Sequence, residues 1–338
     1  MTDRVRIAQV GVGYWGKNLL RNFHSLADVQ TICDANPDVL SRIGAQYPGV
    51  KTTGNFDDIL NDERVQAVVV ATETPLHFDF ARRALEAGKH VFVEKPMAQT
   101  VEQAEDLVRI ADDNNVRVMV GHLLLYHPAF RYVEGLIRNG DLGEVYYVHS
   151  QRVNLGIIRQ KENAFESLAP HDLSIALMFI HSDPVAVSAQ GHAYLQDGIE
   201  DVVFATVYFA SGQIAHLHTS WLDPQKQRAV TVVGSNKMAI IDDVSSSEKV
   251  RLYDKGVVVA PGESRYAEYA EAMSIRDGDI VIPKLPTEEP LRAECKHFVD
   301  CVATGTNPRS DGRNGLAVVR MLSAAMTSLR NRGAAVEV

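Results

Sequence analysis

Short apolar runs alternate with amphipathic segments over the first third of the chain. Residues 5–10 and the β-branched run 67–71 have the composition of strands that are buried in a sheet. Residues 17–26 instead repeat their apolar side chains at helical spacing. This alternation predicts a parallel, doubly wound sheet with helices on both faces and right-handed crossovers. The predicted strands are 5–10, 29–33, 67–71, 90–93 and 116–120, and the predicted helices are 17–26, 78–87 and 101–114.

The pattern changes after about residue 122. A helix near 128–139 leads into a long strand, 143–153, and a helix at about 170–180 has Pro170 in its first turn. Extended β-rich segments follow with no long helix between them, which predicts an α+β domain with a large, mostly antiparallel open sheet. These segments are 184–195, 200–209, 213–222, 226–234, 237–241 and 249–259; an irregular excursion at 261–289 and helices at 290–304 and 312–330, the second capped by Ser310 or Asp311, complete the chain.

Length and composition fit two ordinary globular domains. The chain has 338 residues, and at roughly 150 residues per domain we expect a cofactor domain, 1–122, and a substrate and oligomerisation domain, 123–338. Apolar residues make up 46% and charged residues 23%, which excludes a disordered or collagen-like chain. The net charge of −9 argues against DNA or RNA as the main partner, but it does not exclude a local basic pocket for a small anion.

The sequence shows no membrane or secretory signal. No apolar run approaches the roughly 18 residues that span a bilayer, and the first residues lack a signal-peptide pattern. Three cysteines, an odd number without metal-ligand spacing, fit buried thiols in a reducing compartment, so we expect a soluble cytoplasmic protein. His216 and His218 share one side of a predicted strand without a third ligand, and we predict no metal site. The cysteines are Cys33, Cys295 and Cys301.

A glycine-rich turn joins the first predicted strand to the first helix. Gly11 permits a tight turn, Gly13 lets the backbone approach a pyrophosphate, and Gly16 allows close packing of helix on strand. The helix N-terminus adds free N–H groups for the anion. Asp34, at the end of the second strand, would accept from the ribose hydroxyls, and no arginine follows it, so we predict NAD rather than NADP. Tyr14 and Trp15 lie inside this turn and are counted with the cofactor site.

Two further segments follow central strands of the predicted sheet, where ligands bind in such folds. Thr72 and Thr74 are small and hydroxylated, which suits contact with a ribose or a nicotinamide. His77 is either a neighbour of the cofactor or a helix-start histidine that the backbone satisfies. Glu94 and Lys95 follow the strand 90–93, where an ammonium group can polarise a substrate oxygen or take part in proton transfer; the alternative is a surface ion pair.

These motifs, together with Gly121-His122, resemble the Gfo/Idh/MocA oxidoreductases, which include glucose–fructose oxidoreductase and inositol dehydrogenase. The resemblance spans nearly the whole chain, and Glu94-Lys95-Pro96 is its most specific part. It implies a Rossmann domain followed by an α+β domain whose open sheet often forms an oligomer interface. We therefore expect a homo-oligomer, a dimer or a tetramer, formed through the C-terminal sheet.

The resemblance also implies that His171 is an acid/base residue, usually with an aspartate four residues earlier. Here that position is Ser167, so Glu166 or Asp172 would replace the aspartate, or His171 would act with Lys95 alone. In the first turn of the predicted helix, the helix dipole would keep the imidazole neutral and able to accept a proton. Asp172 also fits an ordinary carboxylate at a helix N-terminus.

Polar residues at the exit of the long strand are candidate substrate ligands. Arg152, Asn154 and Arg159 would hold a polyhydroxylated or anionic substrate, and they equally fit an exposed polar strand end. The pattern Arg152-x-Asn154-Leu155-Gly156 resembles a subgroup that acts on nucleotide-linked sugars. Tyr126 and His127 either line the same pocket or pack in the core.

The sequence thus predicts an NAD-dependent oxidoreductase for a secondary alcohol or ketone of a sugar, most directly a nucleotide-linked sugar. Lys95 and His171 are the predicted catalytic residues, and Lys95, His171 and Asp172 are counted among the substrate contacts. The alternatives are a cyclitol or free-sugar dehydrogenase, a glycosidase with tightly held NAD, and a non-catalytic sensor that binds NAD. In each case NAD is the expected cofactor.

Overall fold

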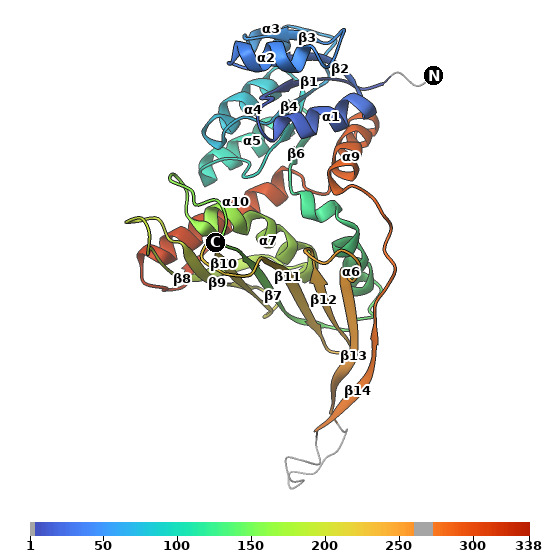
Figure 1. Cartoon of the computed structure of the whole chain (residues 1–338), viewed down its shortest axis with the longest axis vertical. Coiled ribbons are helices and arrows are strands. Elements are labelled where there is room, and N and C mark those ends of the chain that lie inside the picture. The colour runs from blue at the N-terminus through green and yellow to red at the C-terminus, as the bar shows by residue number, and fades with distance from the viewer. Residues whose placement is uncertain (1–3, 260–272) are drawn as a thin grey trace. The chain divides into compact units, whose positions relative to one another are not determined.

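The structure, a computed structural model, describes residues 4–259 and 273–338 (Figure 1). It forms two compact units: the first runs to His127 and includes Glu288–Arg320, and the second contains the other described residues. The sequence predicted a single division after residue 122. The chain instead returns to the first unit because Phe298 packs edge-on against Phe23 and Phe92, with ring centroids 6.0 and 5.7 Å apart.

The first unit holds a parallel six-stranded sheet in the order β3-β2-β1-β4-β5-β6. The strand order reverses between β1 and β4, which is where such sheets bind ligands at their carboxyl ends. The strands are β1 (Arg6–Val10), β2 (Asp28–Cys33), β3 (Lys51–Thr53), β4 (Ala67–Val70), β5 (His90–Val93) and β6 (Val118–Val120). The helices are α1 (Gly16–Leu26), α2 (Pro37–Gly44), α3 (Asp57–Leu60), α4 (His77–Glu86), α5 (Val101–Asp113) and α9 (Pro290–Thr304), with the 3-10 turns η1 (Thr74–Leu76) and η2 (Leu123–Tyr126).

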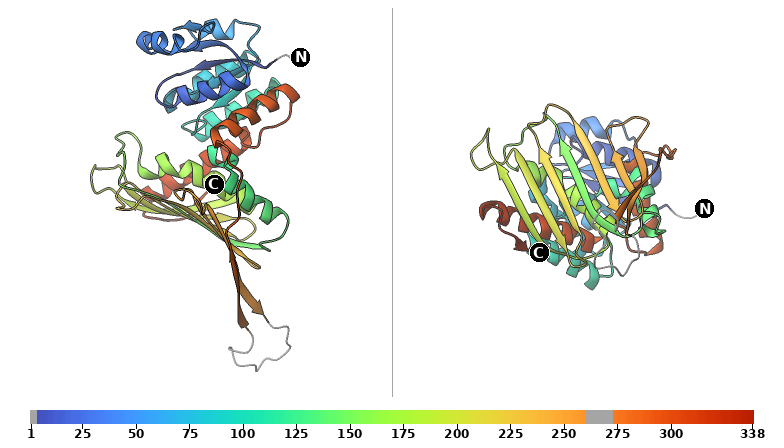
Figure 2. Two further views of the ribbon diagram at one scale, coloured as in Figure 1. Left: turned by 45° about the vertical axis from the view of Figure 1, so that its right-hand side comes forward. Right: turned by 90° about the horizontal axis from the view of Figure 1, so that it is seen from below.

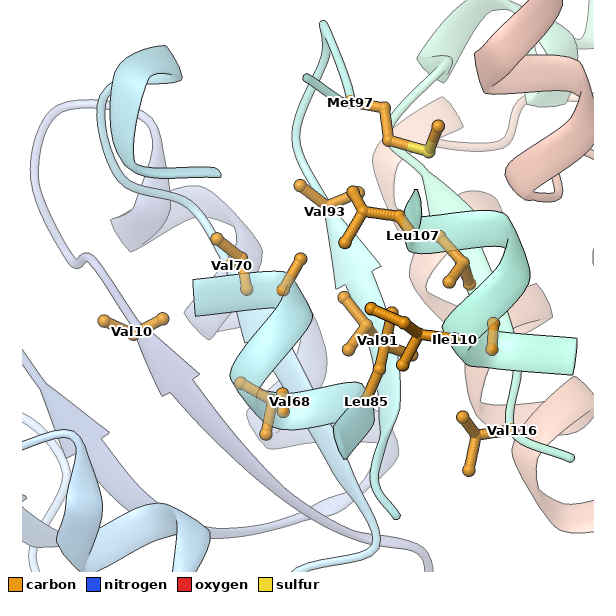
Figure 3. Packing of buried hydrophobic residues seen from close by; sticks show 14 of the residues in the cluster. Val10, Val68, Val70, Leu85, Val91, Val93, Met97, Leu107, Ile110 and Val116 are labelled. Atoms are coloured by element: carbon orange, nitrogen blue, oxygen red, sulfur yellow. The ribbon is translucent and has the colours of Figure 1, made fainter. Parts of the chain in front are cut away.

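The predicted doubly wound sheet is confirmed, and its core follows from the β-branched runs. Valines of β1, β4 and β5 pack against leucine and isoleucine side chains of α4 and α5 (Figure 3). Val68, Val70 and Val91 are fully buried. Strands without exposed side chains hold the loops after them in fixed positions, which is what a binding site at the sheet edge requires.

The second unit holds a nine-stranded sheet in the order β14-β13-β12-β11-β7-β10-β9-β8-β15. It is mostly antiparallel, as predicted, with one parallel pair between β7 and β10. The strands are β7 (Val145–Val153), β8 (Pro184–His192), β9 (Val202–Phe209), β10 (Ile214–Ser220), β11 (Gln227–Gly234), β12 (Met238–Asp242), β13 (Val250–Val259), β14 (Met273–Val281) and β15 (Val336–Glu337).

The prediction of an irregular excursion at 261–289 is wrong for part of its length. Met273–Val281 is strand β14, which pairs with β13 in antiparallel register and continues the sheet. Residues 261–272 lie outside the described part of the chain. The apolar alternation of β14 stops after Ile275 at the charged and glycine-containing run 276–279, so the sequence carries only a weak strand signal here.

Helices cover one face of this sheet. They are α6 (Pro128–Arg138), α7 (Ala164–Ile180) and the C-terminal part of α10 (Gly312–Arg330), whose Asp311 accepts from Asn314 N–H at 2.9 Å as predicted for its cap. No helix of the second unit's described residues lies over the other face, which Figure 2 shows face-on from below. None of the helices in the described ranges is both long enough and apolar enough to cross a membrane.

Candidate functional site

The glycine turn after β1 is closed so tightly that two of its glycines admit no side chain. Gly11 has a φ of +84°, and a Cβ there would lie 2.5 Å from the carbonyl oxygen of Ala71. A Cβ on Gly16 would lie 2.3 Å from the carbonyl oxygen of Gly11. Buried Gln9, which sequence reasoning missed, donates from its side-chain amide to the carbonyls of Gly11 and Gly16, both at 2.8 Å.

The same turn is open where an anion would approach. A Cβ on Gly13 would meet nothing within 4 Å, and α1 begins without a side-chain cap. The backbone N–H groups at a helix start bind phosphate when no side chain occupies them. Tyr14 is 87% exposed beside this opening. The turn therefore fits the pyrophosphate of a dinucleotide.

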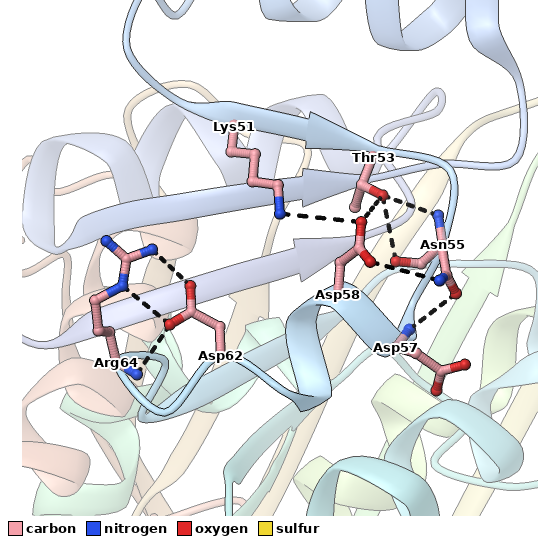
Figure 4. A network of polar contacts seen from close by, with 7 residues as sticks. All are labelled: Lys51, Thr53, Asn55, Asp57, Asp58, Asp62 and Arg64. Atoms are coloured by element: carbon pink, nitrogen blue, oxygen red, sulfur yellow. Dashed lines mark hydrogen bonds and ion pairs between the residues drawn. The ribbon is translucent and has the colours of Figure 1, made fainter.

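Asp34 follows β2 and is held by backbone N–H groups. Its carboxylate accepts from Val12 N–H at 2.9 Å and from Asn36 N–H at 3.0 Å. A carboxylate has about four acceptor positions, so lone pairs remain for ribose hydroxyls. The backbone N–H of Asp34 donates to the backbone carbonyl of Thr53. The hydroxyl of Thr53 donates to Asp58 at 2.6 Å, as Figure 4 shows. A second carboxylate, that of Asp58, is therefore linked through Thr53 to the backbone of Asp34.

We expect Asp34→Ser combined with Ala35→Arg to shift cofactor preference from NADH toward NADPH. The change removes the ribose acceptor and supplies a guanidinium for the phosphate; charge-assisted hydrogen bonds of about 1.5–3 kcal/mol correspond to roughly tenfold or more in each Kd. Calorimetric titration with both cofactors measures the shift. Asp106→Lys, which replaces an exposed carboxylate on α5 and changes the net charge by the same +2, is the control for net charge. An unchanged Kd ratio in the double variant would contradict the role of Asp34.

His77 ties two of the predicted cofactor segments together. Its side chain is buried, with Nδ1 2.8 Å from the carbonyl oxygen of Pro96 and Nε2 3.1 Å from that of Thr72. Burial lowers the pKa of His77, against the opposing effect of these two carbonyls. These contacts fit the interpretation of His77 as a histidine whose ring nitrogens are satisfied by the backbone. Thr72 and Thr74 remain only partly buried at this edge.

Glu94 and Lys95 follow β5 at the same carboxyl edge. Trp15 donates its indole N–H to Glu94 at 2.5 Å. The Glu94 carboxylate packs so closely on Gly121 that a Cβ added to this glycine would lie 3.1 Å from it. The backbone N–H of Lys95 donates to the other carboxylate oxygen at 3.2 Å. Burial raises the pKa of Glu94, and the Trp15 hydrogen bond partly offsets the effect. The structure thus brings Trp15 of the glycine turn and Glu94 into direct contact.

A group of buried polar side chains lies beside Glu94, and sequence reasoning missed most of it. His122 is 1% exposed, and neither ring nitrogen has a hydrogen-bond partner among the described residues. Burial, and then the charge of Lys95, lowers the pKa of His122 to about 3, so its imidazole is neutral. Glu294 on α9 is equally buried, and burial together with Glu94 raises its pKa well above the usual value. Tyr126, a candidate substrate contact, is buried and its hydroxyl lies 2.9 Å from that of Ser310, so it packs in the core.

The raised pKa of Glu294 predicts a pH-dependent penalty on folding. A carboxyl whose pKa is higher in the folded than in the unfolded chain stabilises the fold below its unfolded pKa and loses that contribution as the pH rises through its folded pKa. We therefore expect Glu294→Gln to gain unfolding free energy relative to the wild type as the pH rises. Urea denaturation at mildly acidic and mildly alkaline pH measures this. Glu289→Gln, beside the start of the same helix, is the exposed control, and a pH-independent difference for Glu294→Gln would contradict the prediction.

In the second unit, His171 lies in the middle of α7 and not in its first turn, which corrects the prediction. The helix begins at Ala164, where Asn163 and Glu166 form a reciprocal capping box, and Pro170 lies inside it. The signal was in the sequence, since Asn and Glu three residues apart mark a helix start. The dipole argument for a neutral His171 therefore does not apply.

Both carboxylates proposed to replace the missing aspartate, Glu166 and Asp172, make other hydrogen bonds. Glu166 accepts from the N–H of Asn163 at 3.0 Å as part of the cap. Asp172 accepts from Arg152 at 2.7 Å and from Ser150 at 2.6 Å. Only side chains three or four positions away share the helix face of His171, and these two lie five and one positions away. Ser167 is therefore the residue that occupies the aspartate's place on the helix.

The candidate substrate residues at the end of β7 and in the segment after it differ in burial. Arg152 is buried and faces α7, whereas Arg159 is exposed and lies 3.6 Å from Glu162. Asn154, at the strand exit, is partly buried. The three residues that seemed equivalent in sequence thus have different surroundings.

Within the part of the chain that the structure describes, the cysteines and the two histidines of β10 give no metal centre. All three cysteines are free and buried, as predicted, and burial is the first cause that raises the pKa of each. His216 and His218 lie on one side of β10, where His216 is 3.0 Å from Thr206 and His218 stacks on Phe204. Within the described ranges, no group of three or more histidine, cysteine or acidic side chains is arranged to hold a metal ion.

Comparison with known proteins agrees with this geometry. Residues 5–122 match the oxidoreductase family with an NAD-binding Rossmann fold, and residues 130–240 match the GFO/IDH/MocA C-terminal domain. The chain belongs to the Gfo/Idh/MocA oxidoreductases. The first unit of this oxidoreductase is thus an NAD-binding Rossmann domain, and the glycine turn, the uncapped α1 and Asp34 fit that cofactor.

Individual relatives share the whole fold of this oxidoreductase. UDP-N-acetylglucosamine 3-dehydrogenase of Acidithiobacillus ferrooxidans is 25% identical over 323 residues, which cover 95% of both chains. Its crystal structure superposes with a TM-score of 0.83 at 23% identity over 98% of this chain and 99% of that one. GenD2 from gentamicin A biosynthesis, solved in complex with NAD, has a TM-score of 0.81 at 22% identity over 100% and 97% of the two chains.

Proposed function

We propose that this protein is an NAD-dependent dehydrogenase that acts on a secondary alcohol of a nucleotide-linked sugar. The observation that carries the proposal is Lys95 beside the Trp15–Glu94 contact, at the edge of the sheet that also carries the glycine turn. The full-length similarity to UDP-N-acetylglucosamine 3-dehydrogenase supports a nucleotide-linked sugar.

The cofactor would be held by residues of the first unit alone. Gly11, Gly13 and Gly16 would shape the turn around the pyrophosphate, and Asp34 would accept from the ribose hydroxyls. When bound, NAD accepts a hydride from the carbinol carbon, or returns it in the reverse direction. The remaining residues that we assign to this site are Tyr14, Trp15, Thr72, Thr74, Glu94 and Lys95, with His77 as a buried neighbour that contacts the carbonyls of Thr72 and Pro96.

Lys95 and His171 would manage the proton of the substrate hydroxyl. As the hydride leaves carbon, the O–H bond breaks and its proton passes to one of these side chains, so that a carbonyl forms. The Lys95 ammonium would stabilise the developing negative charge on oxygen, and the His171 imidazole would accept the proton. Because Ser167 replaces the usual aspartate, His171 would act without a carboxylate on its own helix face.

We further propose that copies of the chain associate through the uncovered face of the second unit's sheet. Tyr147, Ile214 and Tyr208 lie side by side on β7, β10 and β9, and each is between 37% and 42% exposed. Aromatic and aliphatic side chains in one exposed patch mark interaction sites. Light scattering tests this, and a monomer at all concentrations would contradict it.

The free cysteines fit a reducing, cytoplasmic location.

The decisive experiment follows NADH formation. The purified protein is first gently denatured, and released small molecules are identified by mass spectrometry. The protein is then supplied with NAD and a panel of nucleotide sugars, free sugars and cyclitols. Steady NADH formation with a nucleotide sugar alone supports the proposal. NADH formation with a cyclitol or a free sugar would mean that the substrate is not a nucleotide-linked sugar. Release of sugar without net NADH formation would indicate the glycosidase alternative.

A further inference from the structure

Arg152 and Asp172 form a buried ion pair between β7 and α7. The guanidinium Nε lies 2.7 Å from Oδ2 of Asp172, and Nη2 lies 3.0 Å from Oδ1. Ser150, two residues earlier on the same face of β7, donates its hydroxyl to Oδ1 at 2.6 Å. Arg152 is 7% exposed and Asp172 is 2% exposed. The pair is therefore bidentate, shielded from water and supported by a third hydrogen bond.

This arrangement leaves the Asp172 carboxylate little capacity to bind a substrate. Both carboxylate oxygens of Asp172 already accept, and the guanidinium of Arg152 points at α7. A ligand that drew either group out of the pair would leave the other buried and unpaired, which is strongly destabilising. The pair is better suited to hold α7 against β7 than to hold a sugar.

The helix needs such support at this point because Pro170 lies inside it. Proline has no N–H, so the backbone hydrogen bond to the carbonyl of Glu166 is lost. His171 and Asp172 follow immediately. Ser174 donates its hydroxyl to the carbonyl of His171 at 2.8 Å, a contact on the same weakened turn. The ion pair thus holds this turn of α7 against β7, where the turn lacks one of its own backbone hydrogen bonds.

We propose that Arg152 and Asp172 are positioning residues for His171 rather than substrate ligands. Adjacent helical residues point about 100° apart, so fixing the direction of Asp172 toward β7 fixes the direction of His171. The proposal rests on the proposed function, in which His171 handles the substrate proton. In this proposal, the ion pair fixes the rotation of one turn of α7 about the helix axis and its position along that axis.

The test separates positioning from stability. In Arg152→Met combined with Asp172→Leu, apolar side chains replace the pair, a change that often preserves stability. We expect an unfolding temperature close to that of the wild type, an unchanged KM for NAD, and a kcat lowered by about 10²-fold as His171 loses its orientation. Arg228→Met, which removes the looser Arg228–Asp243 contact of 3.7 Å on neighbouring β11, is the matched control and should retain kcat.

A spectroscopic readout keeps the test independent of the substrate. The ring signal of His171 in histidine labelled with carbon-13 is assigned by its absence in His171→Asn. We expect this signal to shift or broaden in the double variant and in Asp172→Asn, and to stay unchanged in Arg228→Met. If the double variant does not fold, Asp172→Asn decides. An unchanged His171 signal, or wild-type kcat in the folded double variant, would overturn the proposal even if the substrate proves to be another sugar.

Discussion

Lys95→Met should lower kcat steeply and leave cofactor binding intact. The substitution keeps the apolar stem and the backbone N–H that donates to Glu94, and removes only the ammonium. A positioned proton-transfer group contributes about 10²–10⁴-fold to the rate, so kcat should fall by that factor. Initial rates of NADH formation on the sugar that supports turnover, together with calorimetric titration of NADH, measure both quantities.

The control for this variant is a lysine of the same unit outside the site. Lys296 on α9 is exposed and lies 2.5 Å from Asp300, four residues further along the helix. Lys296→Met should leave both kcat and the NADH affinity as in the wild type. A Lys95→Met variant with nearly wild-type kcat would remove Lys95 from the reaction. Loss of NADH binding in the same variant would show that the ammonium itself holds the cofactor and does not act on the substrate proton.

Features that depend on local geometry were predictable from the sequence. A glycine turn between a strand and a helix needs only a few adjacent residues, and Gly11, Gly13 and Gly16 take the expected places. The doubly wound order followed from strand–helix alternation over more than a hundred residues, where each element repeats the same signal. The place of Asp34 directly after β2 was predictable because the end of the second strand is a fixed point of this fold, and its contact with the ribose stays a prediction.

Features that depend on tertiary packing were missed or misinterpreted. Proline favours a first helical turn, so Pro170 concealed the true start at Ala164. Arg152 was predicted as a substrate contact from its charge alone, which gave no indication of its burial or of its ion pair with Asp172. The period of two along β7 places it with Val148 and Ser150, toward α7. Glu294 gave no signal, because its burial comes from the return of α9 to the first unit.

The two glycines of the turn should separate cofactor affinity from folding. Gly13→Ala adds a methyl group where no atom lies within 4 Å, so the unfolding temperature should match that of the wild type. The same methyl group occupies the approach of the pyrophosphate, and the Kd for NADH should rise by at least tenfold, about 1.4 kcal/mol. Gly16→Ala instead forces a Cβ to within 2.3 Å of a backbone carbonyl, and overpacking of this kind costs about 1–3 kcal/mol of stability.

Scanning calorimetry and NADH titration of both variants check this pair of expectations. Each glycine acts as the control for the other, because the chemical change is identical and only the surroundings differ. Wild-type NADH affinity in Gly13→Ala would mean that the pyrophosphate does not approach the turn at this residue, and the cofactor assignment of the whole turn would fail with it. A Gly16→Ala variant as stable as the wild type would mean that the turn can open, and that its closure by Gln9 is not what shapes the site.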